Sequence, residues 1–208
     1  MHLYRRIGAV LAGLLALVVV VNTTPALAQS HGDTTALLSE RVVGDADAPI
    51  TIVEYFSLTC PHCAGFHNDV FDDLKAEYVD TGKVKFVYRD FPLDGVALRA
   101  AMVARCVDSR RYPGIIQVLF KTQNNWARAS DPVAELRKIG QLAGLGDDAF
   151  QSCLQSEALA NGILEQRQAA STAGVQSTPT FTIDGQIYPG SRSVEEFSEI
   201  LDPLLAKN

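Results

Sequence analysis

The stretch ITIVEYFSLTCPHC, residues 50–63, decides the fold of this chain. Its first part, Ile50 to Ser57, is a nearly continuous apolar run, which is typical of a strand covered on both faces. Its last part, Cys60-Pro61-His62-Cys63, places two thiols two residues apart, and such a pair can close into a small disulfide and open again. A strand that ends directly before such a pair indicates thiol redox chemistry.

A helix is expected to begin at this motif. Apolar residues recur at spacings of three and four as far as about Asp80, which is the pattern of a helix with one buried face. The stripe consists of Cys63, Phe66, Val70 and Leu74. Cys63 therefore belongs to the buried face, whereas Cys60 lies at the amino-terminal edge of the helix. Pro61 fits the first helical position, where its missing N–H needs no partner.

The elements after this helix predict an α/β fold. A second strand is expected over residues 84–91, and residues 92–174 carry a helical pattern that is too long for a simple crossover between strands. Residues 180–188 form a predicted β-hairpin with Asp184-Gly185 as its two-residue turn. A final helix follows, and the capping box of Ser193 and Glu196 marks its start.

The first residues have the pattern of an export signal. Arg5 and Arg6 precede an apolar run over residues 7–21, and Ala26-Leu27-Ala28 is the small-residue pattern that signal peptidase recognises. We predict a cleaved signal peptide over residues 1–28, a loose polar lead over 29–43 and one folded domain over 44–208. A retained membrane anchor is the alternative, although a spanning helix needs roughly 20 apolar residues and this run is shorter.

The charge balance argues against a nucleic-acid partner. The chain has 18 Lys and Arg residues against 24 Asp and Glu residues, a formal charge of −6, and the loss of Arg5 and Arg6 with residues 1–28 takes this to −8. All four cysteines lie in the remaining part. An even number of cysteines in an exported protein permits two disulfides.

Thr178-Pro179 stands directly before the predicted hairpin. Together with four other features, this dipeptide makes the chain resemble the DsbA-type thiol:disulfide oxidoreductases. The other features are the strand, the CPHC motif at a helix start, the helical insertion and the export signal. The resemblance covers essentially all of the chain after residue 28. It implies a thioredoxin-like fold with an inserted α-helical subdomain, and a periplasmic enzyme that donates its Cys60-Cys63 disulfide to folding proteins by thiol-disulfide exchange.

The two motif cysteines are expected to have different roles. Cys60 is the reactive thiol, because free N–H groups and the positive end of the helix dipole stabilise its thiolate. Cys63 is the resolving partner. His62 favours the thiolate further if it donates a hydrogen bond or carries a charge. A stabilised reduced form makes the disulfide a stronger oxidant.

A zinc site is the alternative interpretation of the motif, with Cys60, Cys63, His62 and His67 as conceivable ligands. Structural zinc usually needs a second paired ligand set, and none follows at a suitable spacing. We therefore expect no metal and no other cofactor. His67, one turn beyond Cys63, is expected to be a packed or solvated helix residue.

Three further residues are assigned with the help of the resemblance. A cis bond at Thr178-Pro179 would present backbone groups beside the thiols, where an extended substrate can add as a short strand, although an ordinary strand-entry proline is the alternative. Glu54 matches the buried acidic residue of the family and is expected to relay protons to Cys63. The family often pairs this acid with a lysine, for which residues 84–90 offer no clear equivalent. A solvated glutamate remains the alternative.

Cys106 and Cys153 lie beside apolar stripes of the helical insertion. We predict that they form a structural disulfide between two helices, with two buried free thiols as the alternative.

The resemblance implies reduced or unfolded exported proteins as substrates, and a DsbB-like, quinone-linked membrane protein as the reoxidant. We expect a monomer. Two alternative functions remain open: a disulfide isomerase or reductase of the same fold, and a non-enzymatic chaperone-like or metal-handling module. Thr178 bears on the first alternative, because the best-known oxidases of the family have valine there and isomerase-type relatives also have threonine.

Overall fold

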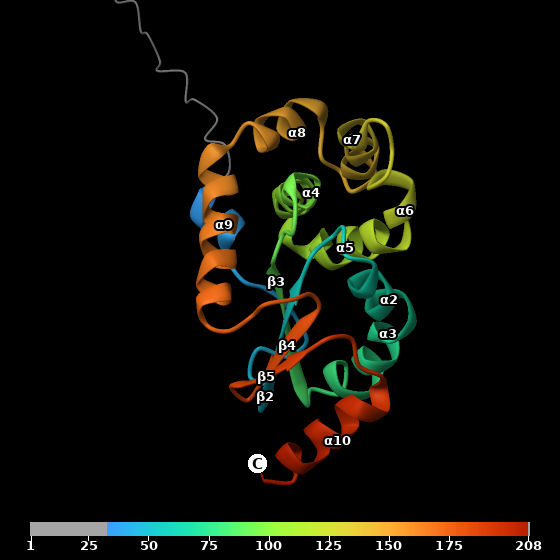
Figure 1. Ribbon diagram of the computed structural model, residues 1–208, viewed down its shortest axis with the longest axis vertical. Coiled ribbons are helices and arrows are strands. Elements are labelled where there is room, and N and C mark those ends of the chain that lie inside the picture. The colour runs from blue at the N-terminus through green and yellow to red at the C-terminus, as the bar shows by residue number, and fades with distance from the viewer. Residues whose placement is uncertain (1–32, 208) are drawn as a thin grey trace, which may run out of the picture. The chain divides into compact units, whose positions relative to one another are not determined.

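The computed structural model describes residues 33–207, which form a five-stranded mixed sheet and its covering helices (Figure 1). The strands are β1 (Arg41–Val43), β2 (Ile50–Phe56), β3 (Val84–Asp90), β4 (Thr180–Ile183) and β5 (Gln186–Pro189). Their order in the sheet is β1-β3-β2-β4-β5. β2 runs parallel to β3, and the other pairs are antiparallel. The strand that leads into the CPHC motif is therefore the central one.

Helices cover both faces of the sheet. They are α1 (Thr34–Leu38), α2 (Pro61–Asp69), α3 (Phe71–Leu74), α4 (Gly95–Cys106), α5 (Tyr112–Lys121), α6 (Gln123–Trp126), α7 (Pro132–Leu142), α8 (Asp147–Leu154), α9 (Glu157–Thr172) and α10 (Val194–Leu205), with a π-helical turn η1 (Lys75–Val79) and a 3-10 turn η2 (Ser109–Arg111). Figure 1 shows α2, α3 and α10 on one side of the strands and α9 on the other. The predicted thioredoxin-like α/β fold with a helical insertion is confirmed, since α4 to α9 all lie between β3 and β4.

The two faces of β2 differ in burial. Every second residue, from Ile50 to Phe56, is buried, and the residues between them are only partly buried. On the less buried face, Tyr55 packs against a small cluster that includes Ala170 of α9, whereas Thr51 lines an open pocket. β2 is thus covered on both faces, as its apolar run predicts, but the cover of the second face is incomplete.

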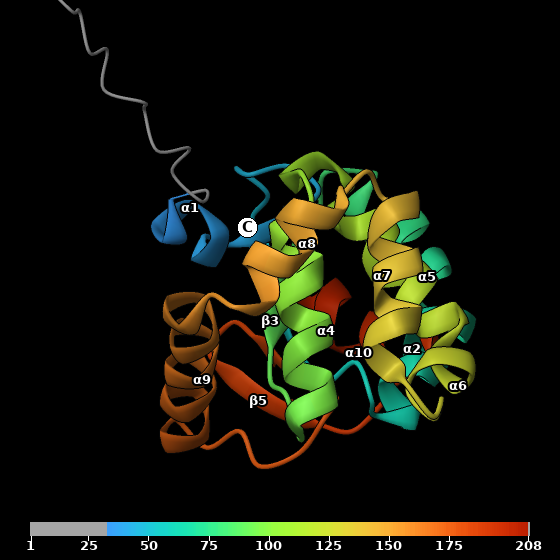
Figure 2. The same cartoon turned by 90° about the horizontal axis from the view of Figure 1, so that it is seen from above.

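The helical insertion packs as a unit above the sheet. Figure 2 shows α4, α7 and α8 side by side, and these three helices contact one another. A disulfide between Cys106 of α4 and Cys153 of α8 joins two of them, with an S–S distance of 2.07 Å. A buried ion pair between Arg105 and Asp90 ties α4 to the end of β3. The insertion is thus fixed both within itself and to the sheet.

The lead before residue 44 differs from the expectation. The part that the structure describes contains α1 and the edge strand β1, which pairs with β3. The guanidinium of Arg105 donates hydrogen bonds to the carbonyl oxygens of Leu37 (2.8 Å) and Ser39 (3.2 Å). These partners are backbone groups, which side-chain polarity in the sequence does not reveal. The predicted signal peptide, residues 1–28, lies outside the described residues.

The local signals near the carboxyl end are confirmed. Asp184 and Gly185 have φ angles of 48° and 77°, the left-handed pair that a tight hairpin turn of this type requires. Ser193 and Glu196 form the capping box of α10. The helix after the motif is less regular than expected, because Val70 leaves helical geometry (φ −128°) and divides it into α2 and α3. Within residues 33–207, no helix combines the length and apolar character needed to cross a membrane.

Candidate active site

The two thiols of the CPHC motif lie where β2 ends and α2 begins. Cys60 is the residue that precedes the first helical turn, with extended backbone angles (φ −77°, ψ 121°), and Pro61 is the first helical residue. The side chain of Cys60 makes no capping hydrogen bond. Its sulfur lies at the amino-terminal end of α2, where the helix dipole favours negative charge. Both cysteines are free thiols in this structure.

The two sulfurs differ in access. Cys60 is 6% exposed, whereas Cys63 is fully buried in the core. An incoming thiolate can therefore reach Cys60 but not Cys63. Cys63 can exchange electrons with the outside only through Cys60, which is the relation between an attacked and a resolving cysteine.

Hydrogen bonds lower the pKa of Cys60 from 9.0 to about 5. The largest cause is the hydrogen bond with the Cys63 thiol; burial opposes it, and the Thr178 side chain and the backbone N–H groups of Cys63 and His62 add to the lowering. Cys60 is therefore a thiolate at neutral pH. The His62 side chain is exposed, and His62 acts on the thiolate through its backbone N–H.

The pKa of Cys63 shifts in the opposite direction. Burial is the largest cause that raises it, followed by the hydrogen bond with Cys60 and the negative charge of Glu54. Cys63 therefore stays protonated across the physiological range. One thiol of the pair is ready to leave or attack, and the other must gain or lose a proton in every reaction cycle.

A cis peptide bond joins Thr178 and Pro179. The carbonyl oxygen of Thr178 lies 3.3 Å from the Cys60 sulfur, and the thiol form of Cys60 donates a hydrogen bond to it. The Pro179 carbonyl accepts a hydrogen bond of 2.8 Å from Gly190, which holds the loop to the end of β5. The reactive cysteine and this loop, 118 residues apart in the sequence, therefore lie in direct contact.

Glu54 lies within the core beneath the motif. It is fully buried, so the alternative of a solvated strand-end glutamate was wrong. Its Oε2 atom lies 2.8 Å from Nε2 of His67, which is also buried. Tyr88 occupies the register position opposite Glu54 on β3. The partner of this carboxylate is therefore a histidine on α2, and not a lysine on the following strand.

Gln123 of α6 holds the loop that leads into the motif. Its buried side-chain amide donates hydrogen bonds to the carbonyl oxygens of Leu58 (2.8 Å) and Cys60 (3.0 Å). These carbonyls lie in the segment where the chain passes from β2 into α2. The helical insertion thus positions the backbone of the reactive cysteine.

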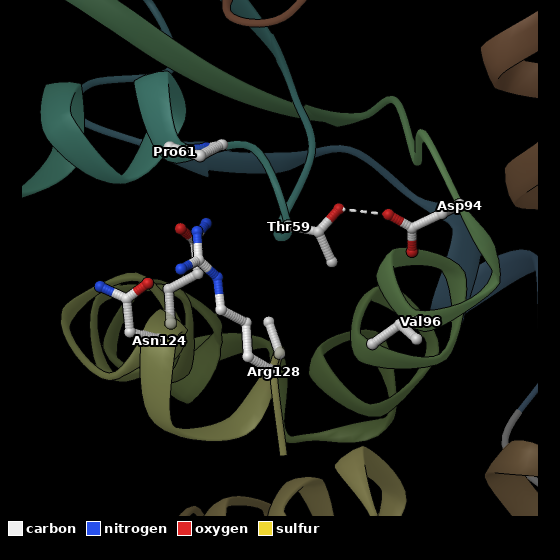
Figure 3. Close-up of a pocket in the computed structure, with 8 residues that line it drawn as sticks. Thr59, Pro61, Asp94, Val96, Asn124 and Arg128 are labelled. Carbon is white, nitrogen blue, oxygen red and sulfur yellow. Dashed lines mark hydrogen bonds between the residues drawn. The ribbon is translucent and has the colours of Figure 1, made fainter. Parts of the chain in front are cut away.

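A pocket of about 150 Å³ adjoins the motif on the side of the insertion (Figure 3). Figure 3 shows Pro61 on one wall and the long side chain of Arg128 on the opposite wall. Thr59 donates a hydrogen bond of 2.7 Å to Asp94, the N-cap residue of α4, at one end of the pocket. The pocket is therefore polar on several sides, and it is lined by the two residues that flank Cys60 in the chain.

The structure brings the sequence-predicted site residues together, and it adds two that the sequence analysis missed. Cys60, Cys63, His62, Pro61, Thr178, Pro179 and Glu54 all lie at or directly below the motif. His67 and Gln123 were missed. The spacing of four residues between Cys63 and His67 puts both on the same helix face, and this was the available signal for His67. Within residues 33–207, no three or more His, Cys, Asp or Glu side chains are grouped as a metal site would require.

Comparisons with known proteins agree with this geometry. A family model described as Thioredoxin matches residues 37–203. A protein of Rickettsia felis named as a putative protein-disulfide oxidoreductase is 31% identical over 169 residues, which are 80% of this chain and 60% of that protein. The chain thus spans about three-fifths of the length of this relative.

Solved structures give the same result. The crystal structure of alpha-DsbA1 from Wolbachia pipientis has a TM-score of 0.75 and 32% sequence identity, and the match covers 81% of this chain and 92% of that one. BdbD from Bacillus subtilis has a TM-score of 0.73 at 22% identity, with 80% and 93% covered, and this likeness concerns the fold alone.

Proposed function

Because the chain belongs to the DsbA-type branch of the thioredoxin family, we propose that it is a thiol:disulfide oxidoreductase that donates its Cys60-Cys63 disulfide to other proteins. One observation carries the proposal: the accessible Cys60, with a pKa of about 5, lies next to the fully buried Cys63 and against the Thr178 carbonyl. A reactive thiol, a resolving thiol and a peptide-binding loop are the three parts that this exchange needs.

The exchange follows from the access of the two sulfurs. A substrate thiolate attacks the Cys60 sulfur, the Cys60-Cys63 bond breaks, and its electron pair goes to Cys63, which takes up a proton. A second substrate thiolate then attacks the substrate sulfur of the mixed disulfide. The substrate leaves with a disulfide, and Cys60 leaves as a thiolate. Electrons balance, because two substrate thiols are oxidised and the enzyme disulfide is reduced.

The low pKa of Cys60 favours the oxidising direction. A thiolate that is stabilised in the reduced protein makes the reduced form more stable, so the disulfide form gives up its bond more readily. The same low pKa makes Cys60 a good leaving group at the end of the exchange. We therefore assign the protein as an oxidase in preference to a reductase.

The loop at Pro179 is the proposed binding site for the substrate backbone. At this cis bond, the Thr178 carbonyl lies against the Cys60 sulfur. An extended peptide that pairs with this loop as a short strand would bring its own cysteine to Cys60. Such binding uses main-chain groups, which suits an enzyme that acts on many unfolded proteins.

We also propose that the protein acts in the periplasm on reduced or unfolded exported proteins, and that a DsbB-like membrane protein reoxidises it. The signal-like pattern of residues 1–28 supports export. The Cys106-Cys153 disulfide supports an oxidising compartment. We propose that the protein is a monomer, since both thiols of the reactive pair belong to one chain.

Two measurements test the proposal together. The redox equilibrium of the Cys60-Cys63 pair is measured against glutathione, and the protein is assayed for refolding of a reduced substrate and of a scrambled one. We expect a strongly oxidising pair that acts on the reduced substrate and fails on the scrambled one. A reducing pair would overturn the assignment as an oxidase.

A second candidate function is disulfide isomerisation, which the threonine before Pro179 favours. Activity on the scrambled substrate, in the same assay, would support this alternative.

A further inference from the structure

A cavity leads from the protein surface to the buried His67. It has a volume of about 140 Å³ and lies between α2, α3 and α5. Asp72, Gly114 and Gln117 are exposed at its rim, and His67, Phe71 and Tyr88 are buried residues of its wall. Since one water molecule takes up about 30 Å³ of liquid, the cavity has room for several. Water can therefore reach the imidazole of His67.

The Glu54-His67 pair joins this cavity to the carboxylate whose charge acts on Cys63. His67 uses Nε2 for its 2.8 Å contact with Glu54 Oε2. The other carboxylate oxygen, Oε1, is buried and has no hydrogen-bond partner within residues 33–207. The charge of the same carboxylate acts on Cys63 and contributes to its raised pKa. Glu54 thus contacts His67 directly, and its charge acts on the resolving cysteine.

The proposed exchange requires a route by which protons reach the buried Cys63, and the Glu54-His67 pair can provide it. Cys63 must take up a proton when its disulfide breaks and release one when the disulfide re-forms, yet its side chain is fully buried. A substrate bonded to Cys60 would also cover this residue, which is only 6% exposed. A second route is therefore needed by which protons can reach and leave Cys63.

We propose that the Glu54-His67 pair and its cavity form a proton path that connects Cys63 with solvent on the flank of α2. The inference rests on the proposed function and extends it to His67, the residue that exchanges protons with water. Glu54 is the group that exchanges the proton with Cys63. His67 acts through Glu54 and is a positioning residue, because it does not touch the reacting sulfurs.

Protons and electrons balance both when the enzyme disulfide is reduced and when it is re-formed. When a substrate thiolate breaks the Cys60-Cys63 bond, the electron pair goes to Cys63, which takes a proton from the pair; His67 then regains that proton from cavity water. When a partner protein's disulfide reoxidises the enzyme, Cys60 first forms a mixed disulfide with it. The Cys63 thiol then gives its proton to Glu54 and attacks the Cys60 sulfur, and the partner leaves as a thiolate.

The surroundings of His67 offer its imidazole no other charged hydrogen-bond partner than Glu54 within residues 33–207. An imidazole has two ring nitrogens, so it can bond Glu54 through one and exchange a proton with water through the other. The neighbouring elements present Tyr88 from β3, whose pKa is raised well above 10.0 by burial, Asp72 from α3 and Lys75 from η1. Lys75 is paired with Asp80 at 2.6 Å. From α5, His67 meets the uncharged ring of Phe120, stacked at 4.4 Å.

The test follows the reaction of the reduced protein with oxidised glutathione, in which the two steps can be separated. Cys60 first forms a mixed disulfide with glutathione; Cys63 then loses its proton and resolves it. Samples are quenched in acid, alkylated and analysed by mass spectrometry. H67Q keeps an N–H donor for Glu54 but cannot carry a mobile proton. We expect an unchanged first step and a resolving step slowed about tenfold or more.

Matched variants separate a proton path from a packing role. N68Q changes the exposed neighbouring residue on the same helix and is expected to leave both steps unchanged. H67A opens the cavity further, and added imidazole is expected to restore its resolving step. In E54Q, imidazole is expected to restore nothing. Resolution by H67Q at the wild-type rate, or equal rescue of E54Q by imidazole, would overturn the proposal.

The same data keep the two proposals apart. A wild-type protein that forms no mixed disulfide with glutathione would contradict the proposed function. A wild-type protein that forms and resolves it no faster than H67Q would contradict the proton path alone.

Discussion

Gln123 donates a hydrogen bond of 3.0 Å from its side-chain amide to the carbonyl oxygen of Cys60. The same carbonyl accepts the hydrogen bond from the Ala64 N–H at the start of α2. A residue of the helical insertion therefore fixes the backbone of the reactive cysteine at the point where α2 begins. The insertion is part of the active site as well as its cover.

Q123L should lower stability and slow the exchange reaction. It leaves the buried carbonyl of Leu58 without its partner and removes one of the two donors to the Cys60 carbonyl, which costs about 1–3 kcal/mol in the free energy of unfolding. Urea denaturation and the rate of disulfide donation check both effects. N125L, at an exposed position of the same helix, is the control. An unchanged rate in Q123L would show that the insertion does not position Cys60.

C60S and C63S should fail at different steps. Without Cys60, no thiol can be reached from solvent, so disulfide exchange should be abolished. Without Cys63, Cys60 can still form a mixed disulfide but cannot be resolved from within, so the mixed disulfide should accumulate. Non-reducing gel electrophoresis with a reduced substrate protein distinguishes the two results. Residual exchange in C60S would contradict the role of Cys60 as the attacked thiol.

The stability advantage of the reduced protein should depend on pH. The pKa of Cys60 is lowered from 9.0 to about 5 in the folded reduced form, and the oxidised form has no such thiolate. This contribution is fully present above about pH 9 and is lost as the pH falls through about 5. Thermal unfolding of both forms from pH 4 to 9 checks it. A difference in Tm that grows toward pH 4 would contradict the sign.

T178V should raise the pKa of Cys60 above about 5 and weaken the oxidant. The change keeps the shape of the side chain and removes the hydroxyl group that favours the thiolate. The pH dependence of Cys60 alkylation reports the pKa, and the glutathione equilibrium reports the oxidising power. T178S keeps the hydroxyl and should resemble the wild type. A lower pKa in T178V would show that the hydroxyl does not stabilise the thiolate.

Removal of the Cys106-Cys153 disulfide should reduce stability without changing the active pair. The bond closes a loop with a sequence separation of 47, for which loop entropy gives about 4 kcal/mol. The C106A/C153A double variant, measured by urea denaturation, should lose an amount of this order. Its Cys60-Cys63 equilibrium with glutathione should match that of the wild type. A large change in that equilibrium would give the second disulfide a redox role.

Features that depend on neighbours in the sequence could be predicted. The hairpin follows from Asp184-Gly185, and the start of α10 follows from Ser193 and Glu196, because each signal lies within a few residues of the structure that it forms. The position of Cys60 at a helix start is equally local. These elements agree with their local sequence.

Features that depend on distant contacts could not be predicted in the same way. The pairing of Glu54 with His67 requires the sheet and α2 to be placed against each other, and the partner lies on α2 and not on β3, where a lysine was expected. The amide of Gln123 reaches carbonyls that lie 63 and 65 residues away. Side-chain identity gives no sign of such a contact, since a buried glutamine resembles an exposed one in the sequence.

The edge strand β1 has a consequence for the order in which the molecule assembles. β1 can pair only after β3 exists, about 45 residues later in the chain. The adjoining α1 contacts α9, and Gln166 donates a hydrogen bond of 3.1 Å to the Leu38 carbonyl. β1 and α1 are therefore synthesised before β3 and α9, and they can dock only after those elements have been made. Pulse-labelling hydrogen exchange should find the amides of β1 among the last to become protected during refolding.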